Sequence, residues 1–466
     1  MIERIPKGVL VGGFGLGVLV LAYLAYSRPG YFTSETYLGG LIGLELLIAA
    51  VWMYRRVFFL VVIFSFLFAG VNLPGGGGVW TTGRWIVLVA GALIGLLIVV
   101  RDRTVSFGTL HILAFFTVLA MLVSTSVSQH PTYTLLKVSS MMLIFLYAST
   151  GARISVAGRE DRFFRGLLIG CEVFVGANAF LYAVGIRAMG NPNSLGAVMS
   201  ICAPILLWGA LLGGTSAVQG RRFLLYAVCL YMVYISRARA GIMAALFASA
   251  FLCFALRRYK LLVEGTIALL ILGSIVSLYE PEAISSTFSS VIYKSHPGEA
   301  ILMSRVSPWQ NALDSIQANP WFGIGLGTTS NEKVGELGMF TSSSVATAEN
   351  GSSYLALLAG VGIVGAIPAV LVLLLIVGKI GRTVHWMWTT RSALHPAIPI
   401  AMLLVAGFVH AAFEDWMFAA GNYMCVFFWS LAFILADVAP VSVPKEVAGP
   451  NRQAGLAPVA ASPFLR

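Results

Sequence analysis

Two arginines stand two residues apart in the segment Ser236-Arg237-Ala238-Arg239-Ala240-Gly241, at the start of a long apolar run. A guanidinium is a planar charged fork that matches phosphate oxygens, and a helix N-terminus adds unpaired N–H groups of favourable polarity. Residues two apart on a helix point about 200° apart, so both face one ligand only if the helix begins between them. The segment predicts an anion clamp with Arg239 as the first contact and Arg237 in support. The alternative is that both side chains reach for lipid headgroups.

Arg305 and Glu349 are the next candidates for chemistry. Arg305 is predicted to be a second phosphate contact, and an ion pair with nearby Glu299 is the alternative. Glu349 stands just before another apolar run, where a partly desolvated carboxylate binds a proton more readily and can serve as a general base. The alternative for Glu349 is a carboxylate at a helix start that interacts only with the helix dipole.

A further set of polar residues near predicted helix ends is predicted to contact a substrate. These residues are Arg187, Asn191, Asn193, Asn350, Tyr354, His410 and Glu414. Helix capping is the alternative for the segment Asn191-Pro192-Asn193, and packing in the interior is the alternative for His410. The sequence has no Cys-x-x-Cys pair and no histidine pair at metal-ligand spacing, so neither a metal nor another cofactor is expected.

The elements that must position these residues are membrane helices. The chain has 466 residues, of which 58% are apolar and 11% are charged, and nearly every apolar run reaches the ~17–25 residues that a spanning helix needs. We therefore expect an all-α integral membrane protein with about 14 transmembrane helices. The expected spans are 8–26, 38–54, 57–73, 85–100, 110–127, 133–149, 166–186, 195–213, 223–236, 240–256, 261–278, 353–378, 397–413 and 418–437.

The basic residues predict how the chain is oriented. With both termini in the cytoplasm, most of the 30 lysines and arginines fall in cytoplasmic connections, which is the usual bias of membrane proteins. The formal charge of +11 is then explained by basic residues that anchor the cytoplasmic loops, so it does not indicate nucleic acid as a partner. The basic residues left on the outer side are Arg28, Arg84, Arg187, Arg237, Arg239, Lys294, Arg305 and Lys333. Because arginine outside runs against the bias, these residues call for an explanation.

The spans and loops divide the chain into three parts. Residues 1–165 are expected to be N-terminal membrane helices, residues 166–437 a catalytic core, and residues 438–466 a disordered cytoplasmic tail. The core contains one long outer loop, 279–352, with a short helix expected at 308–318 that presents Trp309, Leu313 and Ile316 on one face. The glycine turn at 323–327 lacks the lysine of a Walker loop, so it does not indicate a nucleotide site.

From about residue 187 to 437 the sequence resembles the O-antigen ligase and polymerase superfamily. The resemblance rests on Asn191 to Gly196, on the Ser-Arg-Ala-Arg-Ala-Gly segment at 236–241, on Arg305 with Trp309 followed by the glycine turn, and on Glu349-Asn350 before Tyr354. Their order, spacing and shared predicted side of the membrane make the match specific. The first six expected spans match only in being apolar.

The resemblance implies a metal-independent, GT-C type glycosyltransferase at the outer, periplasmic face of the bacterial cytoplasmic membrane. Its donor is a glycan on undecaprenyl diphosphate, and its arginines take the charge of the leaving group. The acceptor is another lipid-linked glycan for a polymerase or lipid A core for a ligase; membrane lipids and a chain-length regulator are further expected partners. Ligases typically carry His-Asn where this chain has Glu349-Asn350, which favours the polymerase. A flippase for lipid-linked oligosaccharides is the non-enzymatic alternative. A transporter should show two related halves and charged residues near mid-bilayer, whereas this chain has one large outer loop and its candidate residues near one surface.

Overall fold

The computed structural model describes residues 58–68, 77–102, 107–189, 191–279, 303–328 and 350–440, together with four isolated positions nearer the N-terminus. Every regular element in these residues is a helix, and they contain no strand. The elements are α4 (Phe58–Phe68), α5 (Gly77–Asp102), α6 (Thr109–Val127), α7 (Pro131–Tyr147), the π-helix η2 (Ala148–Ala152), α8 (Arg153–Val156), α9 (Glu160–Ala183), α10 (Pro192–Leu211), α11 (Ser216–Ile235), α12 (Arg239–Ala255), α13 (Tyr259–Tyr279), α15 (Met303–Ala318), α16 (Ser353–Thr390), α17 (Ala397–Ala411) and α18 (Tyr423–Val438).

The length and apolarity of the helices confirm a multi-pass, all-helical membrane protein. Lipid offers no partner for backbone polar groups, so a spanning segment must satisfy them internally, as a helix does. In the described part, six helices are long and apolar enough to cross a membrane: Gly83–Val100, Thr109–Val127, Pro131–Val156, Glu160–Ala183, Pro192–Leu211 and Ser353–Thr390. Three shorter apolar helices are Arg239–Ala255, Ala397–Ala411 and Tyr423–Val438. The expected spans 8–26 and 38–54 lie outside the described residues, so the count of fourteen and the orientation stay predictions.

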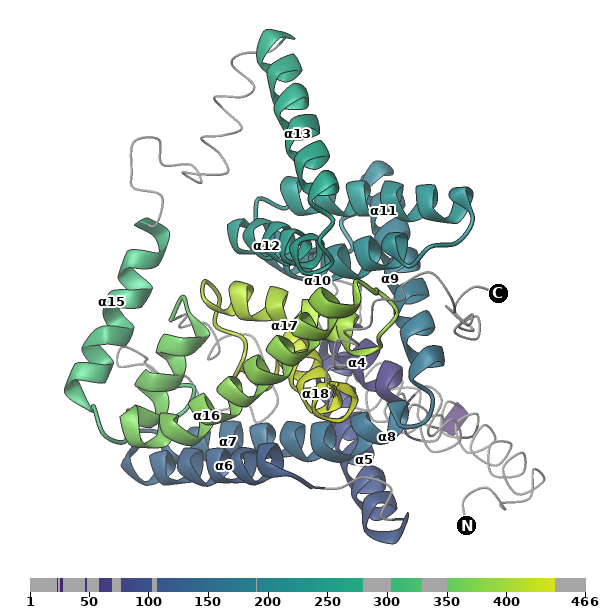
Figure 1. The fold of residues 1–466 in the computed structure, drawn as a ribbon. Coiled ribbons are helices and arrows are strands. Elements are labelled where there is room, and N and C mark those ends of the chain that lie inside the picture. Colours follow the sequence, from purple (N-terminus) through teal and green to yellow (C-terminus); the bar gives the residue numbers. More distant parts are fainter. Residues whose placement is uncertain are drawn as a thin grey trace.

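Helix α10 is the most enclosed of the six long helices, with 89% of its apolar window buried. It packs against α9, α11, α12 and α17, while α18 lies beneath α17 in the centre of the bundle (Figure 1). The crossing of α10 and α12 depends on two glycines. A Cβ on Gly196 would lie 2.3 Å from the Cβ of Ala238, and one on Gly241 would lie 2.8 Å from the carbonyl oxygen of Gly196. The two sequence segments that carry the family resemblance here therefore pack directly on each other.

Helix α16 is broken near its start, at Gly362, where φ is 68°. The segment after α15 supplies the missing hydrogen bonds: the N–H groups of Ile324 and Gly325 donate to carbonyls on one side of the break, at 2.9 Å each. On the other side, the N–H of Ile363 donates to the carbonyl of Pro320 at 2.8 Å. A break at membrane depth is tolerated where other parts of the protein satisfy the backbone, as here. The glycine turn at 323–327 thus has a structural role, as a partner of α16.

Helix α15 departs from the prediction at its start and in its orientation. It begins at Met303, so Pro308 lies within it and not at its first turn, while its end at Ala318 agrees with the predicted end at 318. The predicted apolar face is not the face that packs on the bundle: Ala312 and Ser315 are buried, whereas Leu313 is 42% exposed. The reason is that α15 packs against α16 through small side chains, which allow a close approach.

A buried ion pair ties the opposite end of the bundle together. The guanidinium of Arg153 donates to both carboxylate oxygens of Asp437 at 2.6 Å, and its Nη1 lies 2.7 Å from Nε2 of His111. Arg153 follows directly on η2, the widened turn that ends the α7 helix. From Pro131 to Arg153 the helical rise of 1.5 Å per residue gives roughly 33 Å, about the thickness of the bilayer core. The predicted tail at 438–466 lies almost wholly outside the described residues.

Candidate functional site

The start of α16 is locked to the turn between α17 and α18. The hydroxyl of Ser353 accepts hydrogen bonds from the backbone N–H groups of Trp416 and Met417, each at 3.0 Å, and donates to the carbonyl of Glu414 at 2.7 Å. The Ser353 side chain is fully buried, so this three-way contact is shielded from solvent. The contact fixes where residues 350–354 lie relative to Glu414.

Helix α15 joins the same site through an arginine and a tryptophan. Arg305 forms an ion pair with Glu414, and the two side chains are 14% and 17% exposed. The indole N–H of Trp309 donates to the carbonyl of Gly351 at 3.1 Å. Glu414, 109 residues away in sequence, is thereby a partner of the Arg305 guanidinium. Glu299, the alternative partner, lies outside the described residues.

Arg239 reaches this site from a fourth segment. It is the first residue of α12, and the guanidinium of Arg305 lies close enough to repel its charge. Two arginines that approach each other despite their repulsion, next to Glu414, are an arrangement that suits an anion. The prediction that Arg239 makes the first contact agrees with this placement, although no bound anion tests it.

Asn350 extends the site on the side of the predicted base. Its Nδ2 donates to a carboxylate oxygen of Asp415 at 3.2 Å, which places Asn350 beside the α17–α18 turn. Glu349 precedes Asn350 in the chain and lies outside the described residues. Tyr354 uses its hydroxyl to donate to the carbonyl of Phe408 at 3.0 Å, so it braces α16 against α17.

His410 is packed in the interior of the protein, which is the alternative that the sequence analysis gave for this residue. It is 4% exposed, and its Nδ1 accepts a hydrogen bond from the indole N–H of Trp416 at 2.8 Å. The neutral ring therefore carries its proton on Nε2. Its place under the Arg305 site gives it a role in packing and orientation.

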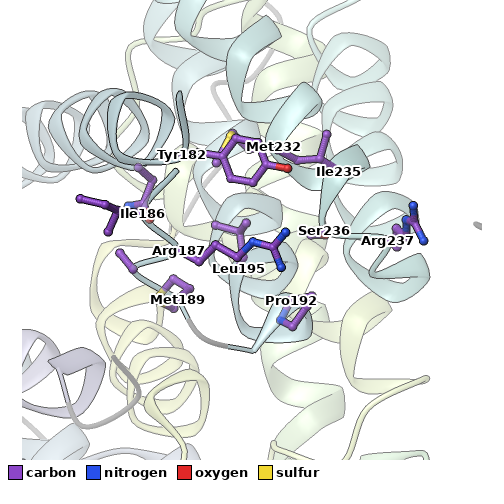
Figure 2. A pocket seen from close by; sticks show the side chains of 12 residues that line it. Tyr182, Ile186, Arg187, Met189, Pro192, Leu195, Met232, Ile235, Ser236 and Arg237 are labelled. Carbon is purple, nitrogen blue, oxygen red and sulfur yellow. The ribbon is translucent and has the colours of Figure 1, made fainter. Parts of the chain in front are cut away.

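Arg237 and Arg187 lie apart from Arg305. Both line a separate cavity between α9, α10 and α11 (Figure 2). Arg237 has a φ of 53° and α12 begins two residues later, so the chain turns the two arginines of the segment in different directions. The structure therefore groups Arg239 with Arg305 and groups Arg237 with Arg187.

Two other predicted residues have a local structural role. The side chain of Asn191 caps α10 by accepting a hydrogen bond from the backbone N–H of Asn193 at 2.9 Å, which is the capping alternative. Arg84, another basic residue predicted on the outer side, is 7% exposed and donates to the carbonyl of Gly421 at 2.7 Å.

The sequence argument did not identify Ser353, Trp309 or Asp415 as members of the site. Trp309 and Ser353 lie close in sequence to Arg305 and Glu349, in the segments that carry the family resemblance. This closeness in sequence was the one feature that could have indicated them. Their contacts run over tens of residues of sequence, which no local pattern reveals. In the part of the chain that the structure describes, no group of three histidine, cysteine or acidic residues is placed to hold a metal.

A comparison with protein families gives one match. Residues 224–370 match the family described as O-antigen ligase. The matched segment is about a third of the chain and contains Arg237, Arg239, Arg305, Glu349 and Tyr354. No curated protein matches the chain. Members of this family are glycosyltransferase-like enzymes of polysaccharide biosynthesis. The match confirms that this membrane protein is similar, over residues 224–370, to the O-antigen ligase and polymerase superfamily.

Proposed function

We propose that the protein is a polysaccharide polymerase that uses an undecaprenyl-diphosphate-linked glycan as donor and a second lipid-linked glycan as acceptor. The observation that carries this proposal is the convergence of Arg239 and Arg305 beside Glu414, from segments far apart in the chain. The cost of holding two like charges together is offset when an anion binds between them. A diphosphate leaving group is such an anion, and its charge grows as the reaction proceeds.

The proposed reaction is a single displacement at the anomeric carbon of the donor. The oxygen of an acceptor hydroxyl forms a bond to this carbon, while the bond from the carbon to the diphosphate oxygen breaks and its electron pair leaves with the lipid diphosphate. The proton of the hydroxyl passes to a base. Arg239 and Arg305 stabilise the departing charge, as preorganised donors do in other transfer enzymes. Protein cations supply this stabilisation without a metal.

Glu349 is the proposed base. The support comes from Asn350, which follows it in the chain and whose amide contacts Asp415 next to the Arg305–Glu414 pair. Glu414 is engaged with Arg305 and His410 is buried against Trp416, so each already has another role. A general base contributes typically ~10²–10⁴-fold, so Glu349→Gln is expected to slow turnover by that factor while donor binding is retained. A folded Glu349→Gln protein with a near-parental rate would remove Glu349 from the mechanism.

A ligase is the second candidate, because the matching family is described as O-antigen ligase. Against it stands Glu349-Asn350, where the resemblance leads us to expect His-Asn in a ligase. The ligase and the polymerase share the donor and the leaving group, and they differ only in the acceptor. The experiment that distinguishes the two functions must therefore identify the acceptor.

The test is reaction of the purified protein with lipid-linked repeat units, with and without lipid A core. A polymerase yields a ladder of products from the repeat units alone, whereas a ligase yields product only when lipid A core is added. Arg239→Ala should strongly slow the formation of either product, and Arg382→Ala, which removes an exposed arginine near the far end of α16, should not. No product under either condition from folded protein would exclude both functions.

A further inference from the structure

The cavity lined by Arg187 and Arg237 has the composition of a site for an anionic lipid. It has a volume of about 380 Å³ and lies between the end of α9, the connection to α10 and the end of α11. Met189 and Leu195 contribute buried apolar wall, and Met232 closes the inner end. Such a volume is at the lower end of ligand sites and suits a head group with the first part of a chain.

The polar side chains that line this cavity include the two arginines, Tyr182 and Asn178. Figure 2 shows Arg187 reaching from the connection after α9 toward Ser236, with Tyr182 beside the cavity, while Arg237 lies beyond Ser236 at the edge of the cavity. Asn178 also lines it and is 8% exposed. Its Nδ2 donates to the carbonyl of Phe174 at 2.9 Å, so its carbonyl oxygen is the atom left to accept from a hydroxyl. The guanidinium groups, the phenol and the amide suit a phosphorylated head group, and the apolar wall suits the hydrocarbon chain of a lipid.

One rigid turn separates this cavity from the Arg239–Arg305 site. Ser236 accepts a hydrogen bond from the N–H of Ala238 at 3.2 Å, and Gly196 packs against both residues. The Cα atoms of Arg237 and Arg239 are at most about 7 Å apart along the chain, yet their side chains serve different sites. One turn therefore positions an arginine for each of the two sites.

We propose that the cavity of Arg187 and Arg237 holds the diphosphate of the acceptor lipid, and this proposal rests on the proposed polymerase function. Two lipids anchored in one leaflet present their diphosphates at the same depth, so the enzyme needs two sites at one level. The sites must be separate because the two diphosphates repel each other. The donor belongs beside Arg305, where the leaving charge develops. The acceptor reacts at the other end of its glycan, so its own diphosphate needs only to be held.

The first test counts lipid sites without activity. Farnesyl diphosphate, a short prenyl diphosphate, is titrated into the detergent-solubilised protein by calorimetry, and farnesol and inorganic diphosphate are titrated in parallel. We expect two farnesyl diphosphate molecules per chain and much weaker binding of either control. Arg187→Ala and Arg237→Ala should each weaken one site by about 10-fold or more, the usual loss for a hydrogen bond to a charged group. Arg239→Ala should weaken the other site.

The outcomes separate the sources of the anion. Equal binding of inorganic diphosphate at the Arg187 site, or displacement of farnesyl diphosphate from it by phosphatidylglycerol, would overturn a site for a prenyl diphosphate. A single bound farnesyl diphosphate that depends on Arg239 would also overturn it. The exposed-arginine variant Arg382→Ala is the control and should bind two molecules like the parent protein.

The second test assigns the site to the acceptor. Initial rates of polymerisation are measured against the concentration of the lipid-linked repeat. Arg187→Ala should raise the concentration needed for half-maximal rate by about 10-fold with a nearly unchanged maximal rate, whereas Arg239→Ala should lower the maximal rate. If the parent protein is active and Arg187→Ala needs the same concentration of lipid-linked repeat for its half-maximal rate, the acceptor site is overturned. An inactive parent would instead overturn the proposed function, while the binding test would still report on the cavity.

Discussion

Two arginine–carboxylate pairs stand at opposite ends of the helical bundle, and they differ in what surrounds them. The side chain of Arg153 is 1% exposed and binds both oxygens of Asp437, and Lys379 lies within electrostatic reach of the same carboxylate. The side chains of Arg305 and Glu414 are 14% and 17% exposed, and a second arginine, Arg239, lies within electrostatic reach of Arg305. Both pairs thus have a second cation nearby, and they differ in how accessible the arginine is. The comparison teaches that an ion pair or a local excess of cations does not by itself mark a site, and that the arginine must also be accessible to a ligand, as Arg305 is.

The largest expected effect is on turnover at the Arg305–Glu414 pair. Arg239→Ala or Arg305→Ala should lower the maximal rate by about 10²–10³-fold, by analogy with the loss of one donor to a developing negative charge. Arg239→Lys should also be impaired, because lysine lacks the planar fork. Arg305→Ala should also lower thermal stability in detergent, because it leaves the mostly buried Glu414 carboxylate without its partner, so its rate is compared at a temperature where the protein is folded. Normal turnover in both alanine variants would leave the anion clamp without support.

The next effect is on stability at the Arg153–Asp437 pair. Arg153→Ala should lower the free energy of unfolding by about 3 kcal/mol, near the lower end for a broken buried pair because the Asp437 side chain is 35% exposed. Thermal unfolding in detergent measures this loss, and Lys260→Ala is the matched control because its pair with Glu264 is mostly exposed. A parental unfolding midpoint in Arg153→Ala would show that the pair does not stabilise the fold.

Exchanging the partners of each pair sharpens the comparison. The double variant Arg153→Asp with Asp437→Arg should recover part of the stability that Arg153→Ala loses, because opposite charges still meet. The double variant Arg305→Glu with Glu414→Arg should fold but stay inactive, because the cation no longer points to the same place. Each is measured by thermal unfolding and by the rate of polymer formation. Activity in the exchanged Arg305 pair would mean that only local net charge matters.

The smallest expected effect is that of a chelator. Activity should persist in EDTA, because Arg239 and Arg305 neutralise the diphosphate in the proposed mechanism. The rate of polymer formation in EDTA, with and without added Mg²⁺, measures this. Loss of activity in EDTA with recovery in Mg²⁺ would instead assign a metal to the acidic residues Glu414 and Asp415, and it would remove the difference in role between the two ion pairs.

Hydropathy predicted the approximate ends of most of the described helices, but α16 continues to Thr390, well beyond the predicted end at 378. A helix is the one way for a single apolar segment to satisfy its backbone in lipid, so an apolar run of sufficient length determines the element. The break in α16 was not predicted, because Gly362 stands in a continuous apolar run and its hydrogen-bond partners come from residues 320–325. The start of α15 was also misplaced, because a proline at position 308 resembles a helix start and was taken for one.

By itself, the sequence determined which polar side chains stand near helix ends, and Arg239, Arg305 and Glu414 were among them. Only the tertiary structure decided which of these side chains meet. Arg305 pairs with Glu414, 109 residues away in sequence, which no local pattern indicated. Likewise, Arg237 lines a cavity with Arg187, whereas Arg239, two residues later, begins α12 and lies near Arg305. The physical reason is that apolarity and helix ends are properties of short segments, whereas the contact between two charges depends on how whole helices pack.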